Sequence, residues 1–110
     1  MAIRIDRRAI RFFFQRLLRG WDDGDTFSLD HTAAIWMLPR LQRFRELTCA
    51  HPSYMTYEEW LETLDKMIYS LEVVSNPKKM WAGGIDWRED GESVQEGLEL
   101  LGKHWLDLWW

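Results

Sequence analysis

Apolar side chains recur at spacings of three and four residues in four segments of the chain, and no segment sustains the alternation of a β-strand. Such spacing places the apolar side chains on one face of an α-helix. We therefore predict an all-α protein of about four helices, arranged like a helical bundle. Because 110 residues is a common length for one domain, we expect residues 1–110 to form a single compact domain.

The first predicted helix covers about residues 6–19, and arginines fill much of its polar face. Gly20 follows the last periodic residue, where a glycine can adopt the left-handed conformation that closes a helix. The apolar stripe of this helix consists of Ile10, Phe13, Phe14, Leu17 and Leu18.

The second predicted helix starts within residues 19–32, runs to about Leu47 and contains Pro39. Proline has no backbone N–H and its ring clashes with the carbonyl four residues before it. We therefore expect a kink or a break near residues 35–39. The run that follows, residues 48–53, has the composition of a loop.

The third and fourth predicted helices each begin at a sequence typical of a capping box. Thr56 precedes Glu59 by three residues, and Ser93 precedes Glu96 by three. The third helix is expected to end at the SNPKK run of residues 75–79, and the fourth to run close to the end of the chain. The tryptophans that fall on the apolar stripes, and are therefore expected in the core, are Trp36, Trp60 and Trp105.

Composition narrows the class of protein. Apolar residues make up 46% of the chain and charged residues 29%, which is typical of a globular protein. A single cysteine, Cys49, allows no internal disulfide, and no uncharged apolar run is long enough to cross a membrane. Arginines interrupt the N-terminal region throughout, unlike a secretory signal. We expect an intracellular protein that does not bind membranes.

Charge is distributed unevenly along the chain. Residues 1–19 contain six arginines and one aspartate, a net charge of +5, so residues 20–110 carry −9 of the total of −4. This asymmetry is found in arms that bind nucleic acid, and equally in basic helices that dock on an acidic body. We favour docking of the first helix.

The stretch RGWDDGDTFSLDHT, residues 19–32, contains three closely spaced aspartates but does not match a calcium-binding loop. An EF-hand loop needs a bidentate glutamate at position twelve, and counting from Asp23 puts Ala34 there. We interpret the stretch as the end of one helix and the start of the next. The candidate caps of the second helix are Asp25, Thr26 and Ser28.

No constellation of residues is typical of an enzyme. Potential zinc ligands are scattered, at His31, Cys49, His51 and His104. Cys49 and His51 lack the third group that would orient a catalytic pair, and no glycine-rich phosphate loop is present. Glu62 precedes Lys66 by four residues, the spacing of a solvated ion pair. We expect no catalytic site, no metal and no cofactor.

Arginines and tryptophans outside the apolar stripes are the strongest candidates for a binding site. The run RRAIRFFFQRLLRGW, residues 7–21, mixes basic and aromatic residues, but its phenylalanines follow core spacing and the rest of the chain is acidic, so we do not expect nucleic-acid binding. Tryptophans beside arginines in loops are typical of stacking pockets and of protein interfaces. The alternative is that they cover a small core. The candidate ligand- or partner-binding residues are Arg16, Arg19, Trp21, Trp87 and Arg88.

Residues 11–47 and 51–72 resemble a group of small phage and prophage proteins of no established function. The shared features are the WDDGDTFSLD turn, the PRLQRF segment and the PSYMTYEEW helix start. Phe27 stands where the group usually has tryptophan, and the resemblance does not extend beyond Pro77.

The resemblance implies a phage protein in the cytoplasm of a bacterial host. We expect a non-enzymatic binding protein that antagonises host defence, by sequestering a nucleotide immune signal, and that works as a homo-oligomer. Two alternatives remain open. The protein could inhibit a host defence protein directly, or it could be a structural or assembly accessory of the phage.

Overall fold

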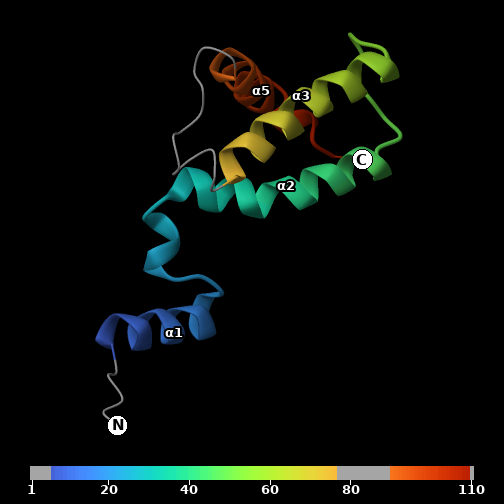
Figure 1. Cartoon of the computed structure of the whole chain (residues 1–110). Coiled ribbons are helices and arrows are strands. Elements are labelled where there is room, and N and C mark those ends of the chain that lie inside the picture. Colours follow the sequence, from blue (N-terminus) through green and yellow to red (C-terminus); the bar gives the residue numbers. More distant parts are fainter. Residues whose placement is uncertain (1–5, 77–89, 110) are drawn as a thin grey trace.

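The computed structural model describes residues 6–76 and 90–109 (Figure 1). Four α-helices and two short 3-10 helices make up these residues, so the predicted all-α fold of four helices is confirmed. In chain order the elements are α1 (Arg7–Arg19), η1 (Asp23–Thr26), α2 (Leu29–Leu47), α3 (Tyr57–Ser75), α5 (Gly91–Lys103) and η2 (Trp105–Asp107).

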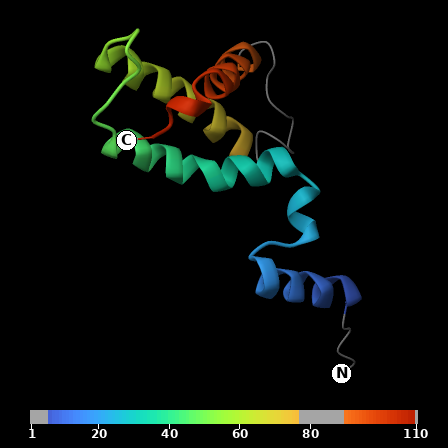
Figure 2. The same cartoon turned by 180° about the vertical axis from the view of Figure 1, so that it is seen from behind.

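The core lies around α3, which packs against α2 on one side and α5 on the other (Figures 1 and 2). Eight α3 residues are buried, and α2 and α5 contribute the rest of the cluster. Burying a large aliphatic or aromatic side chain contributes roughly 1.5–3 kcal/mol, so this three-helix body holds most of the folding energy. The apolar core consists of Ala34, Leu41, Trp60, Leu64, Met67, Ile68, Leu71, Val73, Val74 and Val94.

The close approach of α5 to α3 depends on Gly97 and Ser70. A Cβ atom at position 97 would lie 1.8 Å from Ser70 Oγ and 2.3 Å from the Lys66 carbonyl oxygen. Ser70 is fully buried, and its hydroxyl donates a hydrogen bond to the Val94 carbonyl at 2.8 Å. The glycine therefore lets the α5 backbone contact α3 directly.

Helix α1 lies apart from this body (Figures 1 and 2). Its contacts with other elements are with η1, and none of its residues is buried. The radius of gyration is 17.8 Å and the longest dimension 63 Å, whereas a compact chain of this length has a radius of gyration of about 13 Å. The favoured docking of the first helix on the acidic body is therefore wrong: Arg11, Arg16 and Arg19 contact the aspartates that directly follow α1.

The helix ends agree with the sequence in some places and differ in others. Gly20 closes α1 with φ of 82°, as predicted, and the Thr56 hydroxyl caps α3 by accepting from the Glu59 N–H at 3.1 Å. Helix α5, by contrast, begins at Gly91 rather than near Ser93, and it ends at Lys103 before η2. The last apolar positions of the sequence stripe therefore lie outside the helix.

Pro39 does not break α2, which is one helix from Leu29 to Leu47. The Arg40 guanidinium donates a hydrogen bond to the Trp36 carbonyl at 2.7 Å, one helical turn before it. Pro39 has no backbone N–H to donate to the preceding turn of the helix. The Arg40 side chain donates a hydrogen bond to a carbonyl of that same turn. Of the two outcomes expected at Pro39, the break does not occur.

Candidate binding groove

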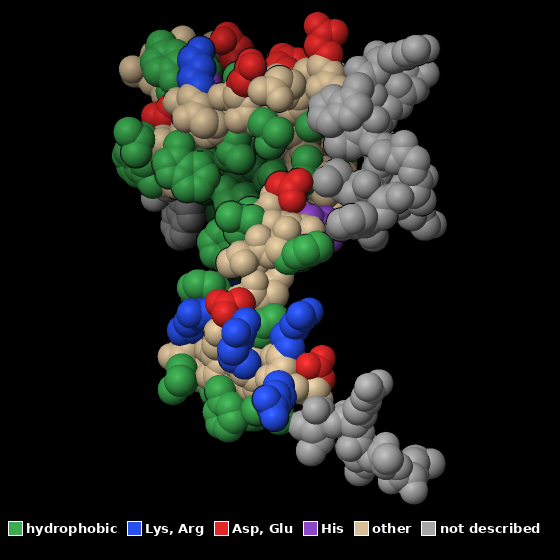
Figure 3. Space-filling model, turned by 90° about the vertical axis from the view of Figure 1, so that its left-hand side faces the viewer, with side chains coloured by type: hydrophobic (Ala, Val, Ile, Leu, Met, Phe, Trp, Pro, Cys, Tyr) green, Lys and Arg blue, Asp and Glu red, His purple; other side chains and the backbone are tan. Residues whose placement is uncertain are grey.

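A large apolar groove of about 1290 Å³ runs along α2 and α5 and extends to η1 and the end of α1. Its floor includes core side chains such as Leu71 of α3 and Val94 of α5. Figure 3 shows hydrophobic side chains gathered on one face of the body, above the arginine-covered α1. Mostly apolar clefts are the usual sites of ligand binding, and open grooves between helices bind partner helices. We call this feature the α2–α5 groove.

Among the described residues, three tryptophans lie along the α2–α5 groove and remain exposed. Trp21 is 47% exposed, Trp36 58% and Trp105 57%, and all three line the groove. The helical stripe assigned Trp36 and Trp105 to the core, and that prediction is wrong; Trp60, from the same prediction, is 1% exposed and central to the core. Helical spacing identifies the face that a residue occupies but not whether a neighbouring element covers that face.

Two of these tryptophans are each held by an arginine. The Arg19 guanidinium carbon lies 3.7 Å from the centre of the Trp21 ring, and that of Arg40 lies 4.1 Å from the centre of the Trp36 ring. A cation over an aromatic ring contributes about 0.5–1 kcal/mol at an exposed site. The stacking limits rotation of both indoles, which lowers the entropy that binding would cost.

The predicted site residues on α1 come together at η1, but the arginines already have carboxylate partners. Arg16 Nη1 lies 2.7 Å from Asp22 Oδ2, and Arg19 Nη2 lies 2.8 Å from Asp23 Oδ1. Of the three predicted binding residues that the structure describes, Trp21 alone lines the groove. The remaining two, Trp87 and Arg88, lie outside the described residues.

Asp22 and Asp23 organise the turn that joins α1 to α2. Asp22 is 5% exposed; its carboxylate accepts from the Asp25 N–H, and the Asp25 carboxylate accepts from the Asp22 N–H at 3.0 Å. Asp23 Oδ2 accepts from the Gln15 side-chain amide at 2.8 Å. The hydrogen bond from Gln15 lowers the pKa of Asp23 below its ordinary value, and the bond from Arg19 lowers it further.

These bonds support the expectation that the aspartates cap a helix, and they correct the expectation of which helix is capped. The aspartates do cap a helix, as the interpretation of residues 19–32 required, but the helix is η1; α2 is preceded by Ser28, whose side chain makes no cap hydrogen bond. Within the described residues no group of three or more histidine, cysteine, aspartate or glutamate side chains is placed to hold a metal ion. The charged groups of this turn therefore have a structural explanation.

The apolar stripe of α1 points away from this turn. Phe12, Gln15, Arg16 and Arg19 contact η1 or its flanking residues, and at 100° per residue they lie on the side of the helix opposite to the stripe. The five stripe side chains are accordingly 43–86% exposed. The sequence identified this stripe correctly, but it could not show that Phe12, off the stripe, is the phenylalanine that packs on the turn.

A second polar cluster lies at the far end of the body from α1. His104 is 1% exposed; its Nδ1 atom lies 3.1 Å from the Tyr54 hydroxyl and 3.1 Å from Asp107 Oδ2. Burial raises the pKa of Tyr54, as does the neighbouring Asp107 carboxylate. The cluster joins η2 to the loop between α2 and α3, and among the described residues His104 hydrogen-bonds to Tyr54 and Asp107 and to no serine or cysteine. We assign it a structural role.

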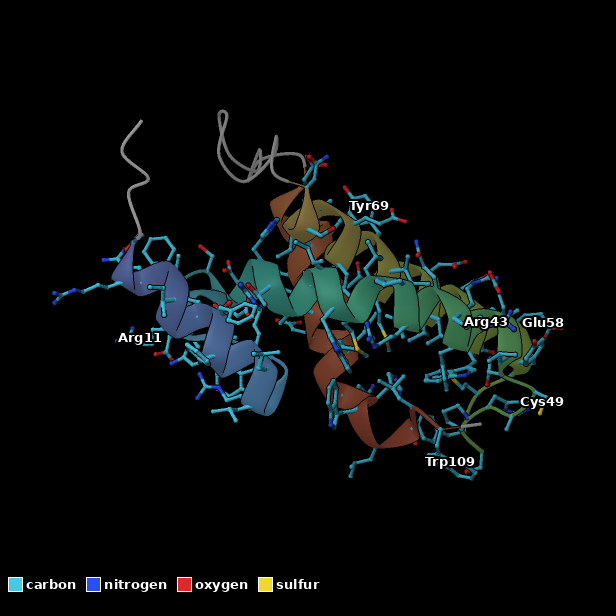
Figure 4. All side chains as sticks on the ribbon, turned by 90° about the horizontal axis from the view of Figure 1, so that it is seen from below. Arg11, Arg43, Cys49, Glu58, Tyr69 and Trp109 are labelled. Carbon is cyan, nitrogen blue, oxygen red and sulfur yellow. The ribbon has the colours of Figure 1, made fainter. Side chains whose placement is uncertain are left out.

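The other chemical candidates from the sequence do not form a site. Cys49 is exposed at the end of the molecule distant from Arg11 of α1 (Figure 4), and His51 Nδ1 donates to the Pro52 carbonyl at 2.8 Å. Lys66, which its spacing paired with Glu62, instead lies 2.9 Å from Glu96 of α5. That hydrogen bond raises the pKa of Lys66, so the residue links two helices.

Comparison with known proteins gives no relative: no protein family, no curated protein and no solved structure matches this chain. No helix among the described residues is long and apolar enough to span a bilayer. Functional interpretation therefore rests on the α2–α5 groove and on the exposed stripe of α1.

Proposed function

We propose that this protein acts by binding, without catalysis, and that its α2–α5 groove takes up an amphipathic helix of a protein partner. The observation that carries the proposal is the row of exposed tryptophans over an apolar floor. Tryptophans that are exposed in the free protein and lose contact with water when a partner binds are typical hot spots of protein interfaces. Grooves between helices bind a partner helix through apolar side chains spaced three and four residues apart.

The charges around the groove favour a protein over a nucleotide. A nucleotide signal needs cations or backbone N–H groups free to bind phosphate. Arg16 and Arg19 already contact aspartates. The groove lining among the described residues contains one arginine, Arg40, which stacks on Trp36 and donates to its carbonyl, and two carboxylates, Asp25 and Asp30. Direct binding of a host protein is therefore better supported than sequestration of a nucleotide immune signal.

The biological setting of the proposal comes from the resemblance to small phage proteins. In that setting the bound partner is a protein of the host's defence, and the phage protein acts in the bacterial cytoplasm as an antagonist. A structural or assembly role in the phage is the second candidate, because exposed tryptophans also pack between subunits of an assembly.

The experiment compares partner capture by the wild-type protein and two variants. Trp36→Asp places a charge in the groove, whereas Leu106→Asp is a matched control, because Leu106 is 86% exposed and does not line the groove. From infected, defence-active cells we expect wild type and the control to retain one stoichiometric host protein that Trp36→Asp loses.

Three results would contradict the proposal. Equal capture by all three proteins would place the binding surface elsewhere. A bound nucleotide with no protein partner, seen by native mass spectrometry, would favour sequestration of a signal. Recovery of the protein as a component of purified virions would favour the assembly role.

A further inference from the structure

Within residues 6–76 and 90–109, two apolar surfaces of matching character have no partner element over them. One is the stripe of α1, whose side chains are 43–86% exposed, and the other is the α2–α5 groove. The stripe has the i, i+3, i+4, i+7 spacing that a groove between helices accepts. A monomer rarely leaves so much contiguous apolar surface in water.

The α1 helix of a chain is held away from the groove of that same chain. Several contacts hold it on η1, the shortest being those of Arg16 with Asp22, Arg19 with Asp23, and Gln15 with Asp23. They involve the side of α1 opposite to the stripe, so the stripe faces solvent. Folding α1 back onto its own body would break these bonds and expose the buried Asp22 carboxylate.

We propose that α1 of one copy fills the α2–α5 groove of a second copy, and that the exchange is reciprocal, giving a two-fold symmetric dimer. Reciprocal exchange covers both unpartnered surfaces of both copies, whereas pairing of two α1 stripes would leave the grooves open. An isologous interface of this kind closes after two subunits.

Charge supports a second copy as the occupant. Among the described residues, the Arg7 and Arg8 side chains of α1 have no acidic partner, and Asp30, which lines the groove, has no cationic one. Residues 1–19 carry +5 and the rest of the chain −9. Two copies that exchange α1 therefore bring opposite net charges together, which also raises the association rate.

The area involved is sufficient for a stable dimer. A fully covered aromatic side chain buries roughly 150–250 Å², and these side chains are about half exposed, so each contributes roughly 100 Å². Covering the stripe and a similar number of side chains in the groove of both copies therefore buries on the order of 2,000 Å². Stable interfaces of standard size bury roughly 1,200–2,000 Å². The dimer rests on the same groove as the proposed function, so a partner helix would have to displace α1 in order to bind.

The test is made on the full chain in two ways. Light scattering over a dilution series measures the concentration at which the dimer dissociates. We expect wild type and Leu106→Asp to be dimers. Leu17→Asp in the stripe and Trp36→Asp in the groove should dissociate at concentrations at least tenfold higher than wild type does. Ile35→Asp serves as a second groove variant if Trp36→Asp fails to fold, since Ile35 is 51% exposed and lines the groove.

Cross-linking then identifies which surfaces meet. In a Cys49→Ser background, one protein carries Leu17→Cys and the other Ile35→Cys, and the mixture is treated with a short bis-maleimide. We expect a covalent pair that contains one chain of each, and none when Leu106→Cys replaces Ile35→Cys. Cross-links only between two Leu17→Cys chains, or a monomer at all concentrations, would overturn the exchange.

The outcomes separate this inference from the proposed function. A monomeric chain whose host partner is still lost in Trp36→Asp would refute the exchange and leave the proposed function standing. A cross-linked exchange dimer whose capture of the host partner is unaffected by Trp36→Asp would refute the proposed function and leave the exchange standing.

Discussion

Arg19 lies over the ring of Trp21, with its guanidinium carbon 3.7 Å from the ring centre, while its Nη2 atom contacts Asp23. One arginine thus joins the last turn of α1, the acidic turn and the tryptophan at one end of the groove. Because the guanidinium is occupied on both sides, its role is to position Trp21, and the indole is the group left for a partner.

Trp21→Ala should separate binding from folding. The side chain is 47% exposed and its stacking on Arg19 contributes about 0.5–1 kcal/mol, so we expect the free energy of unfolding, measured with urea, to change by no more than about 1 kcal/mol. Capture of the host partner should fall at least tenfold. Trp21→Phe, which keeps a ring over the arginine, is the control and should retain most of the binding. Full capture by Trp21→Ala would exclude this residue from the site.

Asp22→Ala should loosen α1 without unfolding the body. The substitution removes a helix cap, which costs about 0.5–2 kcal/mol, and the ion pair with Arg16. Hydrogen exchange should accelerate in residues 7–26 and stay unchanged in α3. The matched control is Glu99→Ala, because Glu99 is an exposed carboxylate of α5 that lies outside both the turn and the groove lining. Acceleration that also reaches α3 would mean that the turn and the core unfold together.

The junction between α1 and η1 should weaken in acid. The hydrogen bond from Gln15, together with Arg19 and Arg11, lowers the pKa of Asp23 below its ordinary value of 3.8. A carboxyl whose pKa is lower in the folded state stabilises that state above its unfolded pKa, and this contribution is lost as the pH falls through the folded pKa. We therefore expect the junction to be intact at pH 5 and above, and to loosen only below pH 3.8.

Gln15→Ala provides the test of this pH dependence. An NMR titration of the Asp23 carboxyl should show its pKa moving up towards 3.8 in the variant, because the largest cause of the shift has been removed. An unchanged pKa would mean that the arginines alone set it. Gln95→Ala is a control, since Gln95 contacts Glu99 on α5 and does not reach the turn.

Two glycines of the same helix should respond in opposite directions to alanine. Gly97→Ala forces a Cβ against Ser70 and the Lys66 carbonyl, and such overpacking costs typically about 1–3 kcal/mol. At Gly102 a Cβ meets no atom within 4 Å, so Gly102→Ala should stabilise α5 by up to roughly 1 kcal/mol. Thermal unfolding of both variants measures the difference. Equal melting temperatures would contradict the close packing of α3 against α5.

The sequence was sufficient for the features that depend on neighbouring residues. The stripe of α1, its end at Gly20 and the cap of α3 by Thr56 all follow from local spacing and backbone preferences, and the structure confirms them. Glycines inside a helix are costly, so Gly97 and Gly102 of the fourth predicted helix both indicate close helix contacts. The structure places α3 against Gly97, whereas a Cβ at Gly102 would meet no atom within 4 Å, so the indication is right at one position and wrong at the other.

Features that depend on which helix faces pack against each other could not be predicted from the sequence. Trp36 and Trp60 both lie on apolar stripes, yet only Trp60 is covered by other helices. Arg16 and Arg19 were identified as binding residues from their number and proximity to Trp21, but the structure gives each a carboxylate partner. The groove brings together residues of α2 and α5 that are more than fifty positions apart in the sequence. The local spacing of tryptophans cannot predict which distant helices lie side by side.

The most direct test of the α2–α5 groove uses a fluorescent peptide with the sequence of residues 6–20. Anisotropy is measured with full-length Leu17→Asp protein, whose own stripe is disabled and whose groove is intact. If the groove accepts an amphipathic helix, the peptide should bind saturably and be displaced by wild-type protein carrying its own α1. Adding Trp36→Asp to the same protein should weaken binding at least tenfold, which corresponds to about 1.4 kcal/mol. Absence of binding, or equal binding to both proteins, would contradict the assignment of the groove as the binding surface.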